Sequence, residues 1–112
     1  MLLMQSAAVA ESKIFQALAD PSRRAILESL TRGEAAVKDL TARFDISQPA
    51  VSQHLATLKE ARLVSGRRAG RCVYYRVEPR GMKPLIDWIA HYRAFWTEHA
   101  LRLERLLEKM DE

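Results

Sequence analysis

The sequence predicts a mainly α-helical domain that contains one small β-hairpin. Three observations predict this class: apolar residues recur at helical spacing through residues 14–58, two short strand-like segments follow around a glycine, and one long helical pattern closes the chain. A chain of 112 residues, 48% apolar and 29% charged, has the size and composition of a single globular domain spanning residues 1–112.

Length and composition exclude several classes of protein. No window approaches the roughly 18 uncharged apolar residues that a membrane span needs, and residues 1–5 are too short for the apolar region of a signal peptide. The single cysteine, Cys72, cannot form an internal disulfide or supply the thiolates of a cysteine-rich zinc site. We therefore expect a cytoplasmic protein without a membrane partner.

Two helices are predicted before residue 33. Asp20 followed by Pro21 supplies an N-cap and a first-turn proline, so a second helix begins there. It ends near Gly33, because glycine can take the left-handed conformation that closes a helix. The apolar positions at helical spacing are Ile14, Phe15, Leu18, Ile26, Leu27 and Leu30.

A short third helix and a turn precede a clearly marked fourth helix. Val37, Leu40 and Phe44 fall on one side of the third segment, and residues 45–47 interrupt the periodicity. Ser47 is a good N-cap and Pro49 lies in the first turn, so a helix begins here and runs to about residue 60. Its apolar face carries Val51, Leu55 and Leu58, and its polar face carries Gln48, Ser52, Gln53, Ala56 and Lys59.

Residues 63–68 and 71–77 are predicted to form the two strands of a hairpin, joined at Ala69-Gly70. β-branched and aromatic residues dominate the second strand, and glycine suits the turn. The tip is basic. Side chains alternate between the faces of the second strand, so Val73, Tyr75 and Val77 share one face, while Cys72, Tyr74 and Arg76 share the other.

One long helix is predicted over residues 84–110. Its apolar positions are spaced alternately four and three residues apart, which is typical of a helix that packs against another helix, either internal or in a partner subunit. Trp88 and Phe95 widen this stripe. We expect oligomerisation to complete the core, because no second domain covers the stripe. The heptad seam comprises Leu85, Ile89, Tyr92, Trp96, His99, Leu103, Leu106 and Met110.

Basic charge is concentrated in the middle of the chain. The net charge of +4 divides into 0 for residues 1–42, +5 for residues 43–76 and −1 for residues 77–112. Such a block favours a polyanionic partner, and nucleic acid is the commonest one in the cytosol.

The order of these elements predicts a helix-turn-helix over residues 34–60 and a wing over residues 63–77. The second helix of such a unit enters the major groove, where Gln and Ser contact base edges, while Arg holds phosphates or enters the minor groove. A polar helix face or a basic hairpin alone is more often plain solvated surface, but their adjacency favours double-stranded DNA as the partner. The candidate DNA-binding residues are Ser47, Gln48, Ser52, Gln53, His54, Lys59, Arg67, Arg68 and Arg71.

Three stretches, ALADPSRRAIL at 17–27, ISQPAVSQHL at 46–55 and YYRV at 74–77, resemble the ArsR/SmtB-type winged-helix transcriptional regulators of prokaryotes. The resemblance covers about residues 14–77. It implies a homodimeric repressor whose first and last helices, residues 1–19 and 81–110, form the dimer interface, with residues 48–60 in the major groove. The candidate interface residues are Ile14, Leu85, Ile89, Tyr92, Trp96, His99, Leu103 and Leu106.

The chain departs from the metal-ligand motifs of the best-known sensors that it resembles. Where some relatives carry Cys-Val-Cys, residues 36–38 are AVK, and Ile89 stands where others carry a His two residues after Asp87. Asp87 and His91 are two ligands without a third, unless Glu98 or His99 of a second subunit completes a zinc site. We therefore predict no metal and no cofactor, and the effector stays unknown. His91 is interpreted as a surface residue and His99 as a packed one.

Several residues have two interpretations. Cys72 is either an oxidant-sensing thiol or, as we favour, a small packing residue. His54 either contacts DNA or turns back to support the recognition helix. Arg23 and Arg24 either reach a phosphate or, slightly favoured, pair with acidic residues across a dimer. The aromatic residues that either line an effector pocket or, as favoured, form interface core are Trp88, Tyr92, Phe95 and Trp96.

The sequence therefore predicts a sequence-specific repressor that occupies an inverted-repeat operator as a symmetric dimer, with recognition helices roughly 34 Å apart. Two alternatives are a protein-interaction module that captures another regulator with the same fold, and a metal- or redox-responsive repressor with a non-standard site. An enzyme is not predicted, because the sequence has no Gly-rich phosphate loop, no plausible nucleophile and His set, and no evident catalytic carboxylate pair.

Overall fold

The computed structural model describes residues 2–111, with side chains described from residue 8 onward. The fold class is confirmed: helices dominate, and one small antiparallel sheet accompanies them. The elements are α1 (Leu2–Leu18), α2 (Pro21–Leu30), β1 (Ala35–Ala36), α3 (Val37–Arg43), α4 (Gln48–Glu60), β2 (Val64–Ala69), β3 (Cys72–Val77), the 3-10 turn η1 (Pro79–Met82) and α5 (Lys83–Asp111).

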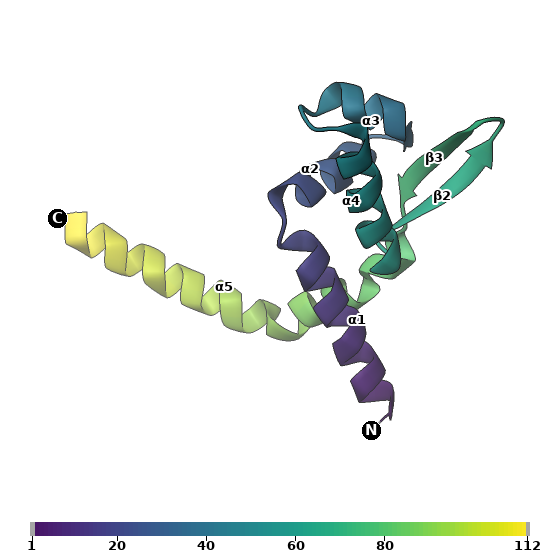
Figure 1. Cartoon of the computed structure of the whole chain (residues 1–112). Helices are drawn as coiled ribbons and strands as arrows, with labels where there is room; N and C mark the ends of the chain where they lie inside the picture. Colours follow the sequence, from purple (N-terminus) through teal and green to yellow (C-terminus); the bar gives the residue numbers. More distant parts are fainter. Residues whose placement is uncertain (1, 112) are drawn as a thin grey trace.

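A single apolar core joins the first four helices to the base of the sheet. Its largest side chains that are less than 2% exposed come from α1 to α4 and from the segment that follows α4. In Figure 1 these helices form a compact body, from which the β2–β3 hairpin projects on one side and α5 on the other. The most deeply buried members are Ile14, Ile26, Leu40, Val51, Leu55, Leu58 and Leu63.

The sheet contains a strand that was not predicted. Its order is β1-β3-β2, and β1 pairs antiparallel with β3 through Ala35 opposite Tyr75 and Ala36 opposite Tyr74. The predicted hairpin is present, but Ala69 pairs with Cys72, so the tight turn is Gly70-Arg71, one residue later than predicted. Gly70 has φ +63°, which glycine adopts without steric cost at the first turn position.

The end of α4 is locked by a pair of backbone hydrogen bonds. The Arg62 N–H donates to the Lys59 carbonyl at 2.9 Å, and the Leu63 N–H donates to the Leu58 carbonyl at 3.0 Å. These are the two bonds of a Schellman motif, and Arg62 takes the left-handed position with φ +63°. Gly81 of η1 packs against this turn: a Cβ at position 81 would overlap the Arg62 carbonyl oxygen.

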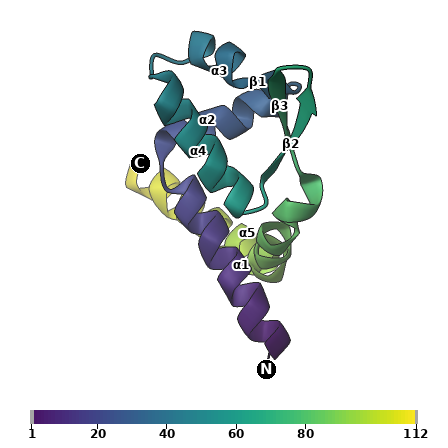
Figure 2. The same cartoon turned by 45° about the vertical axis from the view of Figure 1, so that its right-hand side comes forward.

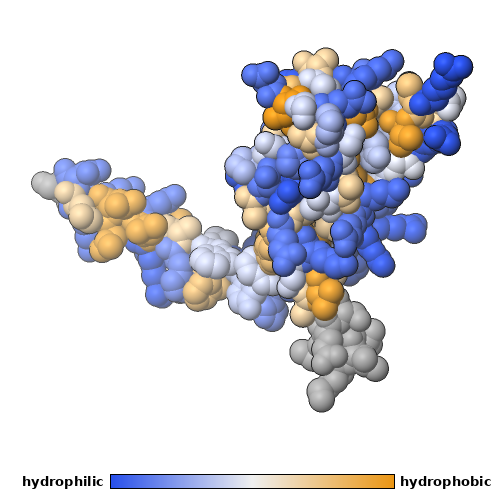
Figure 3. Space-filling view, viewed as in Figure 1, coloured by the Kyte–Doolittle hydropathy of each residue, from blue (hydrophilic) through white to orange (hydrophobic). Residues whose placement is uncertain are grey.

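The long α5 leaves the body after its first turns. Leu85 packs partly against the core, and the Trp88 ring lies 5.5 Å from the Phe15 ring of α1, edge to face. Figure 2 shows the two helices side by side near this contact. None of the α5 residues is buried within the chain. The space-filling view in Figure 3 shows apolar side chains gathered along the projecting part of α5.

Candidate nucleic-acid interface

Helix α4 presents the predicted polar face to solvent. Ser47 caps the helix, because its Oγ accepts a hydrogen bond from the Ala50 N–H at 3.3 Å. Val51, Leu55 and Leu58 are 0% exposed, so the opposite face is fixed outward. That exposed face carries Gln48, Ser52, Gln53 and Lys59, all of them candidate DNA-binding residues.

Helix α3 and the turn position α4 as the second helix of a helix-turn-helix. Leu40 is fully buried, and Phe44 and Ile46 pack against the core on either side of the turn. The predicted break at residues 45–47 is therefore confirmed, and it is anchored by Ile46. Short polar side chains on an exposed helix of this kind can donate to and accept from base edges in a major groove.

Two exposed cations lie at the tip of the hairpin. Arg68 and Arg71 are exposed, and among the described side chains no hydrogen bond or ion pair engages either of them. Arg76 lies nearer the base of the hairpin, where its Nε donates to Ser65 Oγ at 3.3 Å. The tip is thus suited to contact phosphates.

Arg67 differs from its neighbours. Its Nε donates to Glu34 Oε2 at 3.0 Å, and its Nη2 donates to Glu34 Oε1. This hydrogen bonding holds the pKa of the Glu34 carboxyl below its ordinary value. The DNA contact of Arg67 stays a prediction, and the structure adds this intramolecular partner. Glu34 was missed, because a pairing across 33 residues leaves no local sequence signal.

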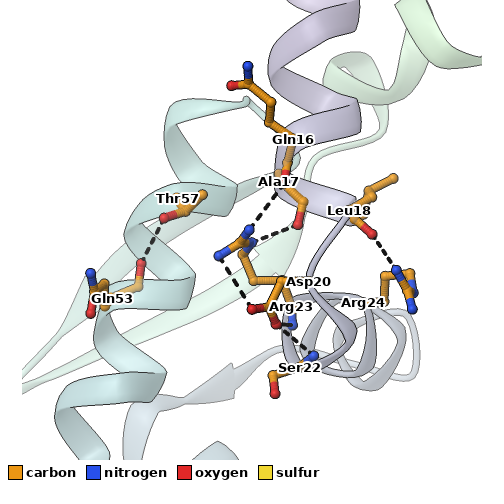
Figure 4. A network of polar contacts seen from close by, with 9 residues as sticks. All are labelled: Gln16, Ala17, Leu18, Asp20, Ser22, Arg23, Arg24, Gln53 and Thr57. Atoms are coloured by element: carbon orange, nitrogen blue, oxygen red, sulfur yellow. Dashed lines mark hydrogen bonds and ion pairs between the residues drawn. The ribbon is translucent and has the colours of Figure 1, made fainter.

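Arg23 and Arg24 both bond to the end of α1 (Figure 4), a role that neither interpretation from the sequence included. Arg23 Nε donates to the Ala17 carbonyl at 2.6 Å and its Nη2 to the Gln16 carbonyl at 3.1 Å. Arg24 Nη1 donates to the Leu18 carbonyl at 2.6 Å. Two arginines of α2 therefore satisfy the last carbonyls of α1 and fix the angle between the two helices.

Asp20 stands at the centre of the same network. Its Oδ1 accepts from the Arg23 N–H at 3.1 Å and from the Ser22 N–H at 2.8 Å, as predicted for an N-cap. The bond from the Arg23 backbone is the main reason that the pKa of Asp20 lies below its ordinary value, and nearby His54 adds to the effect.

His54 turns partly toward the scaffold. The residue is half-buried, and its Nδ1 is buried without a hydrogen-bond partner among the described residues. Of the two interpretations, these observations favour support of the recognition helix over a DNA contact through Nδ1.

The predicted interface residues fall into two groups. The assignment of Ile14 to the dimer interface is corrected by the structure, because its side chain is 1% exposed within one chain and leaves no surface for a second subunit to cover. Leu85 is partly buried against the same core. The other candidates are exposed on α5: Ile89, Tyr92, Trp96, His99, Leu103 and Leu106.

The possible metal ligands are occupied or dispersed. Among the described residues, no group of three or more His, Cys, Asp or Glu side chains lies close enough to hold a metal ion. Asp87 pairs with Lys83 at 2.8 Å and Glu98 with Arg102 at 2.7 Å. The His99 ring stacks on Phe95, with centroids 3.9 Å apart, although the residue is exposed. Cys72 is a half-buried free thiol.

None of the helices in the described part of the chain combines the length and the hydropathy that a membrane span requires.

Comparison with known proteins agrees with this geometry. Residues 20–65 match the family model described as "Bacterial regulatory protein, arsR family". The chain is 42% identical over 96 residues to the HTH-type transcriptional regulator Rv2034 of Mycobacterium tuberculosis, covering 86% of this chain and 87% of the relative. It is 35% identical over 81 residues to the transcriptional repressor SdpR of Bacillus subtilis, covering 72% of this chain and 90% of SdpR.

Solved structures give the same result. The crystal structure of the ArsR family transcriptional regulator RHA00566 superposes with a TM-score of 0.71 at 32% identity, over 80% of this chain and 93% of that one. The family consists of regulators that bind operator DNA rather than enzymes, which agrees with the exposed α4 face and the basic wing tip. The chain therefore belongs to the ArsR family and is a DNA-binding transcriptional repressor with a winged helix-turn-helix fold.

Proposed function

We propose that this repressor acts in the cytoplasm as a symmetric homodimer, joined through α1 and α5, that occupies an inverted-repeat operator. The observation that carries the proposal is the long apolar seam of α5, which no part of the described chain covers. Trp96, Leu103 and Leu106 are 55%, 56% and 58% exposed, although they repeat at heptad spacing. Apolar residues in that pattern are typical of a helix packed against another helix.

The recognition helices supply the sequence preference in this proposal. Gln48, Ser52 and Gln53 of α4 contact base edges, and Ser47 and Lys59 lie at the two ends of the same exposed surface. Arg68 and Arg71 of each wing contact phosphates. Two-fold symmetry places one α4 in each of two major grooves, about one helical turn apart, so the operator half-sites mirror each other.

The regulatory signal is left open by this proposal. Within one chain Asp87 and Glu98 form ion pairs with Lys83 and Arg102, and a zinc site completed by a second subunit stays an alternative that the zinc addition below tests. The aromatic residues of α5 are assigned to the interface, since Phe95 and Trp96 are half-exposed on its apolar side.

The test is fluorescence-anisotropy binding at physiological salt to the DNA upstream of the protein's own gene and to a scrambled duplex. Sedimentation of the free and bound protein gives the stoichiometry. We expect two chains per duplex and tighter binding to the upstream DNA, unchanged by chelator, zinc or peroxide. Equal, weak binding to both duplexes contradicts the proposal and favours capture of another regulator. A response to zinc or peroxide favours the metal- or redox-responsive alternative.

A further inference from the structure

The wing is only partly supported by the rest of the sheet. Strand β1 pairs with β3 at Tyr74 and Tyr75, and Tyr74 in turn pairs with Arg67 of β2. Beyond this row, toward the tip, β2 and β3 have only each other as strand partners among the described residues. A two-stranded hairpin is marginally stable in water, so the Arg67–Tyr74 row is the last one that the body of the protein can hold.

Arg67 is fixed at this row from two sides. Its guanidinium makes two hydrogen bonds to the two oxygens of Glu34, the residue immediately before β1. It also lies 5.1 Å from the centre of the Tyr74 ring, within the range of a cation–π contact. Paired bonds of this fork geometry fix orientation as well as distance, which a single exposed ion pair does not.

The negative charge of Glu34 is unfavourable for DNA binding by electrostatic attraction to the wing. A carboxylate beside a DNA-binding hairpin repels phosphates and neutralises one of the cations that would attract them. The Arg67 hydrogen bonds keep the pKa of Glu34 low, so the carboxylate stays ionised at neutral pH. The side chain is therefore explained better by a structural effect on the wing than by a direct contribution to DNA affinity.

We propose that Glu34 and Arg67 form a wing clamp, in which Arg67 is a positioning residue that orients the hairpin and not a phosphate contact. The clamp holds the tip, with Arg68 and Arg71, at the angle to α4 that lets both elements reach one duplex. Its effect on DNA binding rests on the function proposed above, whereas its effect on the order of the wing does not.

Two substitutions separate positioning from phosphate contact because the two roles predict different results. Glu34→Gln removes a negative charge near DNA: if Arg67 is a masked phosphate contact, binding tightens, but if the clamp positions the wing, operator binding weakens by about fivefold. Arg67→Lys keeps the charge and loses the planar fork, so a phosphate contact largely survives, whereas the clamp is lost.

Wing order is measured directly by hydrogen exchange in the DNA-free protein. We expect faster exchange of the β2 and β3 amides in Glu34→Gln and in Arg67→Lys. Glu28→Gln is the matched control, because Glu28 is an exposed acid of α2 outside the described ion pairs. Arg71→Ala is the control at the tip: it should weaken DNA binding without changing exchange.

We expect the β2 and β3 amides of the wild-type protein and of both controls to exchange more slowly than those of the two clamp variants. We also expect both clamp variants to bind the operator more weakly than the wild-type protein does. Tighter binding by Glu34→Gln, or wild-type binding and exchange in Arg67→Lys, overturns the proposal. If the wild-type protein does not distinguish its upstream DNA from a scrambled duplex, the proposed function fails. The exchange data then still decide whether the clamp exists.

Discussion

Replacing Trp96 with alanine tests the proposed dimer at its largest exposed seam residue. Trp96 is 55% exposed in the single chain. An indole side chain presents up to about 250 Å², so roughly 140 Å² of it is available for a second subunit to cover. At about 25 cal/mol per Å², full burial contributes about 3.5 kcal/mol per subunit, and a symmetric dimer loses this contribution twice. Because burial is incomplete in most interfaces, we expect dissociation to become easier by at least about a hundredfold.

Sedimentation velocity over a range of concentrations measures this change, with circular dichroism to confirm that the variant is folded. Leu101→Ala is the matched control: Leu101 is 50% exposed on the same helix but lies on the side away from the seam. We expect Trp96→Ala to dissociate at concentrations where the wild-type protein and Leu101→Ala remain dimeric. An unchanged dimer in Trp96→Ala, or equal weakening by both substitutions, refutes the assignment of the seam as the interface.

Three further predictions follow from the site and its supports. Gln53→Ala should relax base preference by about 1–3 kcal/mol at one position of each operator half-site, whereas Arg71→Ala should weaken binding to all sequences and make the salt slope shallower by about 2, one unit for each wing of the dimer; competition with single-base operator variants distinguishes them. Gly81→Ala should lower the free energy of unfolding by about 1–3 kcal/mol in urea titrations, since the new Cβ overlaps the Arg62 carbonyl oxygen and the backbone must move; wild-type stability would contradict the packing described. The free energy of unfolding should fall as the pH drops through the acidic range, because the pKa of Asp20 is lower in the folded protein than in the unfolded chain, which takes up the proton first. Asp20→Asn should flatten that part of the pH profile of the urea midpoint. An unchanged profile in this variant would show that Asp20 does not contribute to the pH dependence.

Local signals predicted most of the helix-turn-helix. Ser47 and Pro49 mark the start of α4 within one turn, and Val51, Leu55 and Leu58 identify its buried face by spacing alone. The hairpin was found for the same reason, since glycine and the neighbouring β-branched residues act within a few positions. Each of these features depends on residues close together in the chain, where backbone propensity and periodicity are informative.

What the sequence did not reveal depends on contacts between distant residues. Strand β1 consists of two alanines, which carry no strand signal, and exists because β3 is within reach. Arg23 and Arg24 were expected to face outward, yet carbonyls at the end of α1 bind them. The family resemblance implied an interface that includes the first helix and so Ile14, but the core of its own chain buries this side chain. The hydrogen bonds of Arg67 to Glu34 also join residues that are far apart in the chain, so the sequence did not predict them.

The packing of Gly81 on the Arg62 turn brings the chain before α5 into direct backbone contact with the end of α4. The turn that follows α4 and the 3-10 turn η1 that precedes α5 meet there backbone to backbone, and the Glu78 N–H donates to the Leu63 carbonyl at 2.9 Å beside the contact. Side chains at a contact between two elements can change rotamer when one element shifts slightly, but two backbone segments in contact have no such freedom. We therefore expect a tilt of α5 at η1 to displace the end of α4, which would couple the helix that carries the seam to the helix that faces DNA.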